Sequence, residues 1–217
     1  MPVLSSYITD TRRLLHDANG TQYSDAELTE NINTGRKHVA LDTACLRSLE
    51  TVTLNAAQET YSVQAVTSLL TRAIDVVNIT VLWGNQRVPL IQMVWSEFNA
   101  NLRVWSNFQN MPACYSKYGG PLGPIYIGPV PNTTYTSYWD VFYTPTDLVD
   151  DTTIDPLNYP FSEPVPYYAA YVAKFKQQAY GEAALYQEQY KQKAYWVINS
   201  TFTRVMPNVY AYPQRSW

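Results

Sequence analysis

Residues 166–198 read PYYAAYVAKFKQQAYGEAALYQEQYKQKAYWVI, and their periodicity governs the architecture expected for the chain. Apolar and aromatic side chains recur there in steps of three and four, which places them on one helix face: Tyr168, Val172, Phe175, Ala179, Ala183, Tyr186, Tyr190, Ala194 and Val197. At a rise of ~1.5 Å per residue, the stretch predicts one helix about 50 Å long. A round molecule of this chain length would be about 44 Å across, so the helix suits a structural strut better than a pocket enzyme.

The composition favours a protein that buries much of its surface against other proteins. Of 217 residues, 46% are hydrophobic, enough for one core or a core with a small satellite domain, whereas only 15% are charged. Tyrosine occurs 19 times, and it combines a large contact area with one polar tip, which suits protein–protein interfaces. A tyrosine-rich antiparallel sheet is the alternative explanation.

Charge is distributed unevenly along the chain. From Lys174 onward, six basic residues stand against two acidic ones, a net charge of +4, which leaves −7 for the remainder because the total is −3. An acidic body with a basic end favours docking between unlike surfaces. A protein that reads DNA sequence would instead show a basic face.

Cysteine usage and hydropathy indicate a cytosolic, soluble chain. Cys45 and Cys114 form no CxxC pair, and we expect free buried thiols, with a single disulfide as the alternative. The N-terminus lacks the pattern of a secretory signal, and no apolar run reaches the length of about 18 residues that marks a membrane span.

Two helices are expected in residues 1–47. Ser5 or Ser6 can cap the first, and residues 24–27 (SDAE) have the pattern of a capping box that opens the second. Gly35 lies in the middle of the second helix, where glycine costs about 1 kcal/mol relative to alanine. We expect it to mark a close helix crossing.

Residues 48–160 are predicted to form a β-rich insert. Alternation of polar and apolar residues indicates strands, at 48–54, 59–63, 74–83, 87–90, 125–127 and 138–143. Gly84-Asn85 is a hairpin turn signal. A short helix is expected near 92–105, and residues 147–160 are predicted to form an exposed acidic loop.

The remaining chain completes the bundle and ends in a tail. Residues 161–203 hold the long helix, with Pro164 and Pro166 in its first turn, where missing N–H groups are tolerated. Prolines keep residues 204–217 extended. The expected fold class is α+β: a helical bundle with a long C-terminal amphipathic helix, an inserted β-rich domain and an extended C-terminal tail.

The sequence contains no pattern that predicts a catalytic, cofactor-binding or metal site. His16 and His38 lack the neighbours of a zinc site, His16 being placed for a hydrogen bond at a helix end, and no GxSxG elbow is present. The glycine-rich run at 119–123 is interrupted by proline and followed by no Lys-Ser or Lys-Thr pair. Loop geometry is therefore a better explanation of these glycines than a phosphate-binding loop.

The densest carboxylate cluster comprises Asp147, Asp150, Asp151 and Asp155. It lacks the EF-hand pattern, and its spacing fixes no pair of carboxylates of the kind a glycosidase needs. We interpret it as a solvated turn region, with an adventitious metal or catalysis as the alternatives. We therefore expect the chain not to be an enzyme.

Three segments resemble the head-to-tail adaptor proteins of tailed bacteriophages, also called head completion or connector proteins. Their order and combination carry the resemblance, because capping boxes and amphipathic helices are common. The segments are RRLLHD at 12–17 with YSDAEL at 23–28 and VALDT at 39–43, YGGPL at 118–122 with IYIGPVP at 125–131, and PYYAAY at 166–171 with YGEA at 180–183.

The resemblance implies a structural virion protein, made in the host cytoplasm, that forms a ring of commonly twelve identical subunits in the neck between capsid and tail. Helices would line the ring, with the insert on the tail side or outside. The implied partners are the portal protein, a tail, nozzle or tail-terminator protein, and double-stranded DNA that passes without sequence recognition. No membrane and no cofactor are implied.

The resemblance also implies a docking segment, because a C-terminal extension of such adaptors often binds the portal. The anchors in this chain would be Asn208, Val209, Tyr210, Tyr212, Arg215 and Trp217. An extended aromatic segment cannot bury its own rings and gains by ordering on a partner. A flexible terminus is the alternative.

Two other functions stay open on the residues alone. One is another structural protein of the tail or baseplate. The other is a carbohydrate-binding or glycan-degrading module that uses the tyrosine and tryptophan content.

Overall fold

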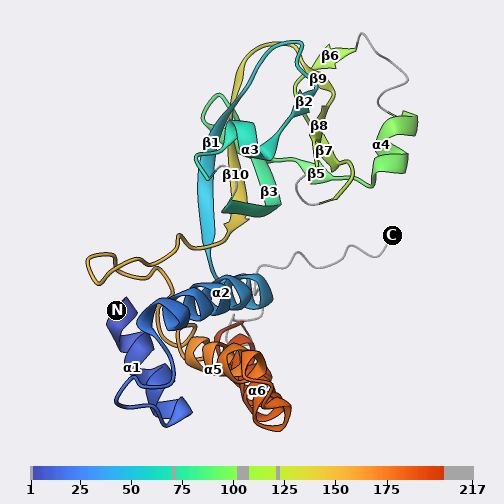
Figure 1. The fold of residues 1–217 in the computed structure, drawn as a ribbon. Helices are drawn as coiled ribbons and strands as arrows, with labels where there is room; N and C mark the ends of the chain where they lie inside the picture. The colour runs from blue at the N-terminus through green and yellow to red at the C-terminus, as the bar shows by residue number, and fades with distance from the viewer. Residues whose placement is uncertain (1, 70–71, 102–107, 121–122, 203–217) are drawn as a thin grey trace. The chain divides into compact units, whose positions relative to one another are not determined.

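The computed structural model describes residues 2–69, 72–101, 108–120 and 123–202, and the chain divides into two compact units (Figure 1). Residues 1–43 and 147–217 form the first, here called the helical unit, and residues 44–146 form the second, here called the β unit. The sequence predicted a β-rich insert from residue 48 to residue 160. In the structure, residues 147–160 belong to the helical unit instead. The predicted α+β class is confirmed.

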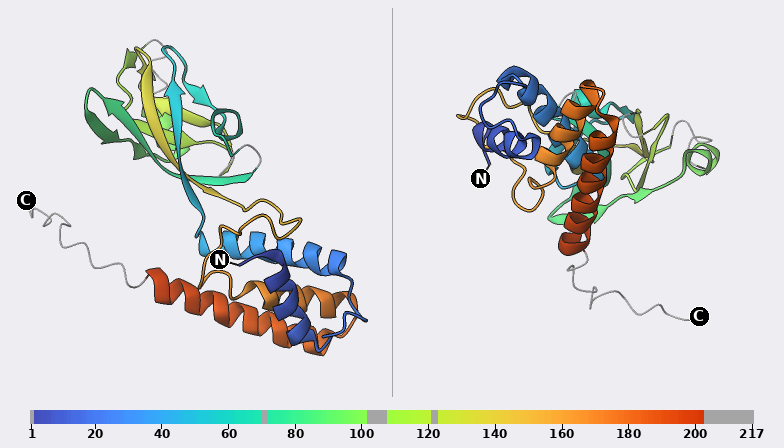
Figure 2. Two further views of the ribbon diagram at one scale, coloured as in Figure 1. Left: turned by 90° about the vertical axis from the view of Figure 1, so that its left-hand side faces the viewer. Right: turned by 60° about the horizontal axis from the view of Figure 1, so that its bottom comes forward.

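Four helices build the helical unit: α1 (Leu4–Leu15), α2 (Asp25–Thr43), α5 (Val165–Lys176) and α6 (Tyr180–Phe202). Helix α5 packs against each of the other three (Figure 2). Its buried face carries Ala169, Ala170 and Ala173, whose small side chains let neighbouring helices approach closely. The helical core is therefore centred on α5.

Gly35 marks the close crossing that the sequence predicted. A Cβ atom at Gly35 would lie 3.2 Å from Cδ1 of Tyr168 and 3.3 Å from the backbone oxygen of Val165. Tyr168 in turn stacks on His38, with ring centroids 4.6 Å apart. A side chain at position 35 would require these neighbours to shift by a few tenths of an ångström.

The single helix predicted for residues 166–198 is wrong, because the chain reverses between α5 and α6. Gln178 adopts a left-handed conformation (φ 63°), and the Ala179 N–H donates to the Lys174 carbonyl at 3.1 Å while the Gln178 N–H donates to the Phe175 carbonyl at 3.0 Å. These bonds form a Schellman motif that ends the helix. The rings of Tyr168 and Tyr190 lie 5.2 Å apart, whereas one straight helix would separate them by about 33 Å.

The helix starts agree with the sequence at two of three places. Helix α1 begins at Leu4, with Val3 as N-cap, so neither Ser5 nor Ser6 caps it. The Ser24 hydroxyl accepts a hydrogen bond from the Glu27 N–H at 3.2 Å, as the capping-box pattern predicts. Helix α5 begins directly after Pro164 and carries a proline in its first turn, also as predicted.

Two four-stranded sheets build the β unit. The first is antiparallel, in the order β1 (Arg47–Leu54), β10 (Tyr135–Tyr143), β3 (Ala73–Trp83) and β4 (Gln86–Pro89). The second has the order β2 (Thr60–Tyr61), β8 (Ile125–Gly128), β7 (Cys114–Lys117) and β5 (Ile91–Gln92), with β5 parallel to β7. The parallel pair β6 (Gln109–Asn110) and β9 (Val130–Pro131) and the short helices α3 (Val63–Val66) and α4 (Trp95–Asn101) complete the unit.

The two sheets share one core, and Trp139 is fully buried within it. Its indole Nε1–H donates to the Ser137 hydroxyl at 2.9 Å, and that hydroxyl donates to the Val52 carbonyl at 2.7 Å. The buried indole therefore has its polar atom satisfied. Cys45 and Cys114 form no disulfide with each other, and Cys114 is buried whereas Cys45 is only partly buried.

The predicted strands are present, and Gly84-Asn85 joins β3 to β4 as a hairpin. Helix α4 occupies part of the range 92–105, and residues 102–105 of that range lie outside the described chain. The glycine-rich run lies between β7 and β8. Gly123 is required there because a Cβ atom would lie 1.7 Å from the Tyr118 carbonyl oxygen.

Replacing Gln178 with glycine is expected to stabilise the protein, because glycine adopts the left-handed conformation without the strain that a side chain adds. We expect Gln178→Gly to raise the free energy of unfolding by about 0.5–1 kcal/mol. The matched control Gln187→Gly, inside α6, should lower it by about 1 kcal/mol. Urea unfolding followed by circular dichroism measures both, and equal losses in the two variants would contradict the assigned helix end.

Candidate functional site

The residues predicted to dock on a partner, Asn208, Val209, Tyr210, Tyr212, Arg215 and Trp217, lie outside the described residues. The acidic cluster lies within them, and each of its carboxylates has a local structural partner. Asp147 pairs with Lys37 at 2.7 Å, Asp151 accepts the Ser5 N–H at 2.7 Å, and Asp150 accepts the Thr152 N–H at 2.9 Å. Among the residues that the structure describes, no three potential metal ligands come together.

Asp155 is not solvated, which corrects the interpretation of the acidic cluster as a surface turn. Its side chain and that of Arg36 are both 0% exposed, and they form an ion pair inside the helical unit. The guanidinium Nε donates to Oδ2 of Asp155 at 2.8 Å, and Nη2 donates to Oδ1 at 2.7 Å. This bidentate geometry is the strongest form of the Arg–carboxylate contact.

Neighbouring groups make further hydrogen bonds to the pair. The Tyr7 hydroxyl donates to Oδ2 of Asp155 at 2.7 Å, and the Leu157 N–H donates to Oδ1 at 3.1 Å. Asn33 accepts from Nη1 of Arg36 at 2.9 Å. Burial, and after it the charge of Asp155, raises the pKa of Tyr7 well above its ordinary value, so the phenol stays protonated and keeps donating.

Asn33 extends this network to the chain that returns from the β unit. Its side-chain amide donates to the Leu148 carbonyl at 3.0 Å, and its side-chain oxygen accepts the Leu148 N–H at 2.9 Å. A buried asparagine on α2 thus pairs with a backbone segment as a strand neighbour would. The network joins α1, α2 and residues 148–157.

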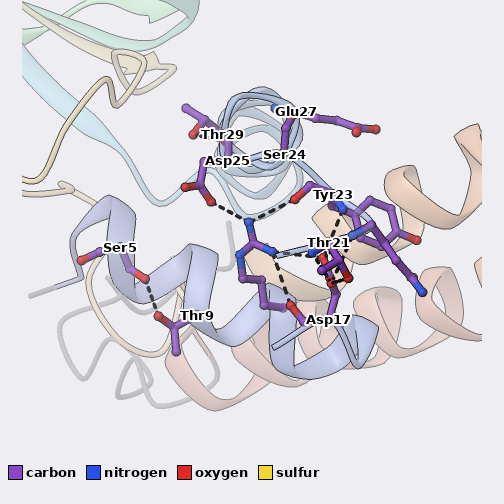
Figure 3. A network of polar contacts seen from close by, with 11 residues as sticks. Ser5, Thr9, Asp17, Thr21, Tyr23, Ser24, Asp25, Glu27 and Thr29 are labelled. Carbon is purple, nitrogen blue, oxygen red and sulfur yellow. Dashed lines mark hydrogen bonds and ion pairs between the residues drawn. The ribbon is translucent and has the colours of Figure 1, made fainter. Parts of the chain in front are cut away.

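A second polar network fixes the turn between α1 and α2, and Figure 3 shows its members Asp17, Tyr23 and Asp25. Arg12 binds all three of them. One guanidinium nitrogen, Nη1, donates to Oδ2 of Asp17 at 3.0 Å, and the other, Nη2, donates to Oδ1 of Asp25 at 2.7 Å and to the Tyr23 carbonyl at 3.0 Å. Arg12 therefore binds both the start of the turn and the start of α2.

The Asp17 carboxylate organises the same turn from the inside. Burial alone would raise its pKa, but hydrogen bonds from the backbone N–H groups of Gln22, Tyr23 and Thr21 outweigh burial and lower the pKa. The carboxylate therefore stays ionised under ordinary conditions. Its contribution to stability is present above the pKa of an unfolded aspartate and is lost as the pH falls through the folded pKa.

A groove lies along the second half of α6 in the helical unit. It has a volume of about 480 Å³ and is lined by Tyr159, Glu163, Tyr167, Gln189, Gln192, Lys193 and Trp196. The four α6 residues follow the spacing i, i+3, i+4 and i+7, so they share one helix face. A second cavity of about 380 Å³ shares Tyr159, Glu163 and Tyr167 with it and continues to Ser6, Asp10 and Arg13 of α1.

An ion pair between Lys193 and Glu163 lies in the wall of this groove. The Lys193 ammonium also lies 5.8 Å from the centre of the Tyr167 ring. The hydrogen bond to Glu163 raises the pKa of Lys193 above its ordinary value, so the lysine remains charged. These contacts hold this wall of the groove in shape.

The groove is rich in aromatic surface that faces outward. Tyr159 is 74% exposed and Trp196 is 48% exposed. Tyr195, the neighbour of Trp196 on α6, is 70% exposed but does not line the groove. The sequence pattern does not predict this groove, because Tyr159 and Trp196 become neighbours only when the chain reverses between α5 and α6.

One known protein family matches this chain. The model of a family described as SU10 adaptor protein matches residues 4–206, which is nearly the whole chain. The chain belongs to the SU10 adaptor protein family. Among curated proteins, none matches the chain.

Membership makes this adaptor a structural protein of the phage virion, a class that is not enzymatic, and it implies contacts with other head or tail proteins. Among the described helices, none is long and apolar enough to span a membrane.

Breaking the buried pair should destabilise the adaptor strongly, because Arg36→Met leaves the Asp155 charge buried without its partner. We expect a loss of about 3–5 kcal/mol in the free energy of unfolding. The matched control Lys37→Met removes the exposed pair with Asp147 and should cost less than about 1 kcal/mol. Urea unfolding compares the two, and similar losses would show that the buried pair does not hold the unit together.

Proposed function

We propose that the protein forms a ring that joins the portal vertex of the capsid to the tail and lets double-stranded DNA pass through its centre. The family match over residues 4–206 carries this proposal. We expect twelve identical subunits. They would contact each other head to tail around a closed circle, so that each subunit uses two different surfaces to bind its two neighbours. The ring would lie in the neck of the virion, with a tail, nozzle or tail-terminator protein below it.

The charge distribution supports helices on the channel side. Residues 44–146 contain five acidic and five basic residues, so the β unit has no net charge. The −7 excess therefore belongs to residues 1–43 and 147–173 of the helical unit. An acidic channel wall repels phosphates, so DNA slides past it without sequence recognition.

Exposed apolar side chains of the helical unit support extensive protein contact. Leu41 of α2, Phe175 of α5, and Tyr180, Leu185 and Tyr195 of α6 are all about half exposed or more. Large aromatic and aliphatic residues of this kind form the centres of protein interfaces. In the proposed ring, neighbouring subunits cover them.

Residues 208–217 are proposed to dock on the portal protein. This segment combines Tyr210, Tyr212 and Trp217 with the basic Arg215 and contains no acidic residue. Tyrosine, tryptophan and arginine are the residue types most enriched at the energetic centres of interfaces.

An image of the virion neck tests the ring directly. We expect density for twelve copies between portal and tail, with helices of the helical unit and their acidic side chains facing the channel. A different symmetry, or a position elsewhere in the tail or baseplate, would overturn the proposal. A basic channel wall would overturn only the account of DNA passage.

Removing residues 208–217 should abolish binding to the portal protein in a pull-down and leave the circular dichroism spectrum unchanged. The substitution of Tyr210, Tyr212, Arg215 and Trp217 by alanine should have the same effect, because these are the proposed anchors. The matched control replaces Gln214 and Ser216 by alanine and should still bind. Portal binding that survives the deletion would refute the docking role.

A further inference from the structure

We infer that the groove along α6 binds the C-terminal segment of the same chain, residues 207–217, in the free subunit. This inference goes beyond the proposed ring, and it does not depend on the portal as a partner. It rests on the lining of the groove, on the residues that follow α6, and on the length of chain that joins the two.

The lining of the groove suits an extended peptide that contains proline and tyrosine. Tyr159, Tyr167 and Trp196 offer ring faces, and proline-rich segments dock in aromatic-lined grooves of this type. Gln189 and Gln192 supply amide groups on the same helix face, which can bond an extended backbone whose own groups are unpaired. Residues 207–217 read PNVYAYPQRSW, with two prolines and three large aromatic residues.

The charges of the groove allow this segment to enter. The two joined cavities contain Asp10 and Glu163 together with Arg13 and Lys193, so the groove is close to neutral. Arg215 of the segment can approach Asp10, whose side chain is 53% exposed and pairs with the exposed Arg13. Aromatic contact, not charge, must therefore supply most of the binding energy.

The chain is long enough to reach the groove. Trp196 lies about 9 Å before Phe202 along the axis of α6, at a rise of ~1.5 Å per residue. Residues 203–206 match the length of about two to five residues that reverses a chain between antiparallel elements. Residues 207–217, at about 3.1 Å per residue in an extended polyproline conformation, then cover about 34 Å, more than the ~10 Å of α6 that lines the groove.

The covalent link between α6 and the segment favours binding of the chain's own segment over binding of the segment from a second copy. A short flexible link gives an effective concentration of ~1 mM, whereas a second copy is present at the micromolar concentration of the protein. A groove that binds the free peptide with a Kd of only ~0.1 mM would hold its own segment about 90% of the time. A second copy would leave such a groove almost empty.

Trypsin cleavage after Arg215 in the full-length protein tests the inference, with intact mass as the readout. We expect Trp196→Ala and Tyr159→Ala each to accelerate cleavage, by up to about tenfold. The matched control Tyr195→Ala removes an exposed ring next to Trp196 but outside the groove, and it should cleave at the wild-type rate. Tyr159→Ala changes an exposed residue outside any helix, so it keeps the test valid if Trp196→Ala disturbs α6.

A photo-cross-linking experiment identifies the binding surface and its source. The photoreactive amino acid p-benzoylphenylalanine replaces Tyr212 in the full-length chain, and irradiation should link it to groove residues of α5, α6 or residues 159–163 within a monomer. Equal cleavage rates in all variants would overturn the inference. Cross-links outside the groove, or cross-linked dimers in place of monomers, would overturn it as well.

Discussion

The buried pair between Arg36 and Asp155 is the constraint on which the helical unit depends, because this unit is assembled from two separate stretches of chain. Residues 1–43 supply α1 and α2, and residues 147–202 supply α5 and α6. Desolvating two charges is expensive, and attraction repays it only when the geometry is good and the other polar groups are satisfied. Tyr7, Asn33 and the Leu157 N–H meet that condition here. The pair therefore specifies which returning segment docks on α2.

The fold of the β unit lowers the entropy cost of joining these two stretches. Strands β1 and β10 pair in antiparallel register, with Arg47 opposite Phe142, and the Tyr143 N–H donates to the Leu46 carbonyl at 3.2 Å. The ends of the insert are thus neighbours once the sheet has formed. Closing a loop of about 100 flexible residues costs about 2–3 kcal/mol more than closing one of about five. Formation of the sheet already includes this extra entropy cost, because it brings the ends of the insert together. The ion pair then closes only a short loop.

The sequence predicted the features that depend on local patterns and missed those that depend on distant partners. The helices of the α+β fold follow from helical periodicity, and the main strands follow from the alternation of polar and apolar residues. The close approach of two helices follows from Gly35, a glycine in the middle of a helix. The helix end at Gln178 was missed because glycine usually occupies the left-handed position, and the stripe of apolar residues continues through the break. Asp155 was read as exposed because its neighbours Asp147, Asp150 and Asp151 are. Only the folded chain shows that Arg36, far away in the sequence, lies beside it.

The tyrosine content has two physical roles, which composition alone could not separate. Some tyrosines donate hydrogen bonds between elements: the buried Tyr190 donates to Asp42 at 2.5 Å, and the half-buried Tyr186 donates to the Leu14 carbonyl at 2.5 Å. Burial, and after it the bond to Asp42, raises the pKa of Tyr190 well above its ordinary value, so the donor persists. Other tyrosines, such as Tyr159 and Tyr195, are largely exposed and present their rings at the surface for binding. The sparse surface charge and the abundant tyrosine therefore have one common cause. An adaptor needs hydrogen bonds that hold its helices together and exposed aromatic rings that bind other proteins.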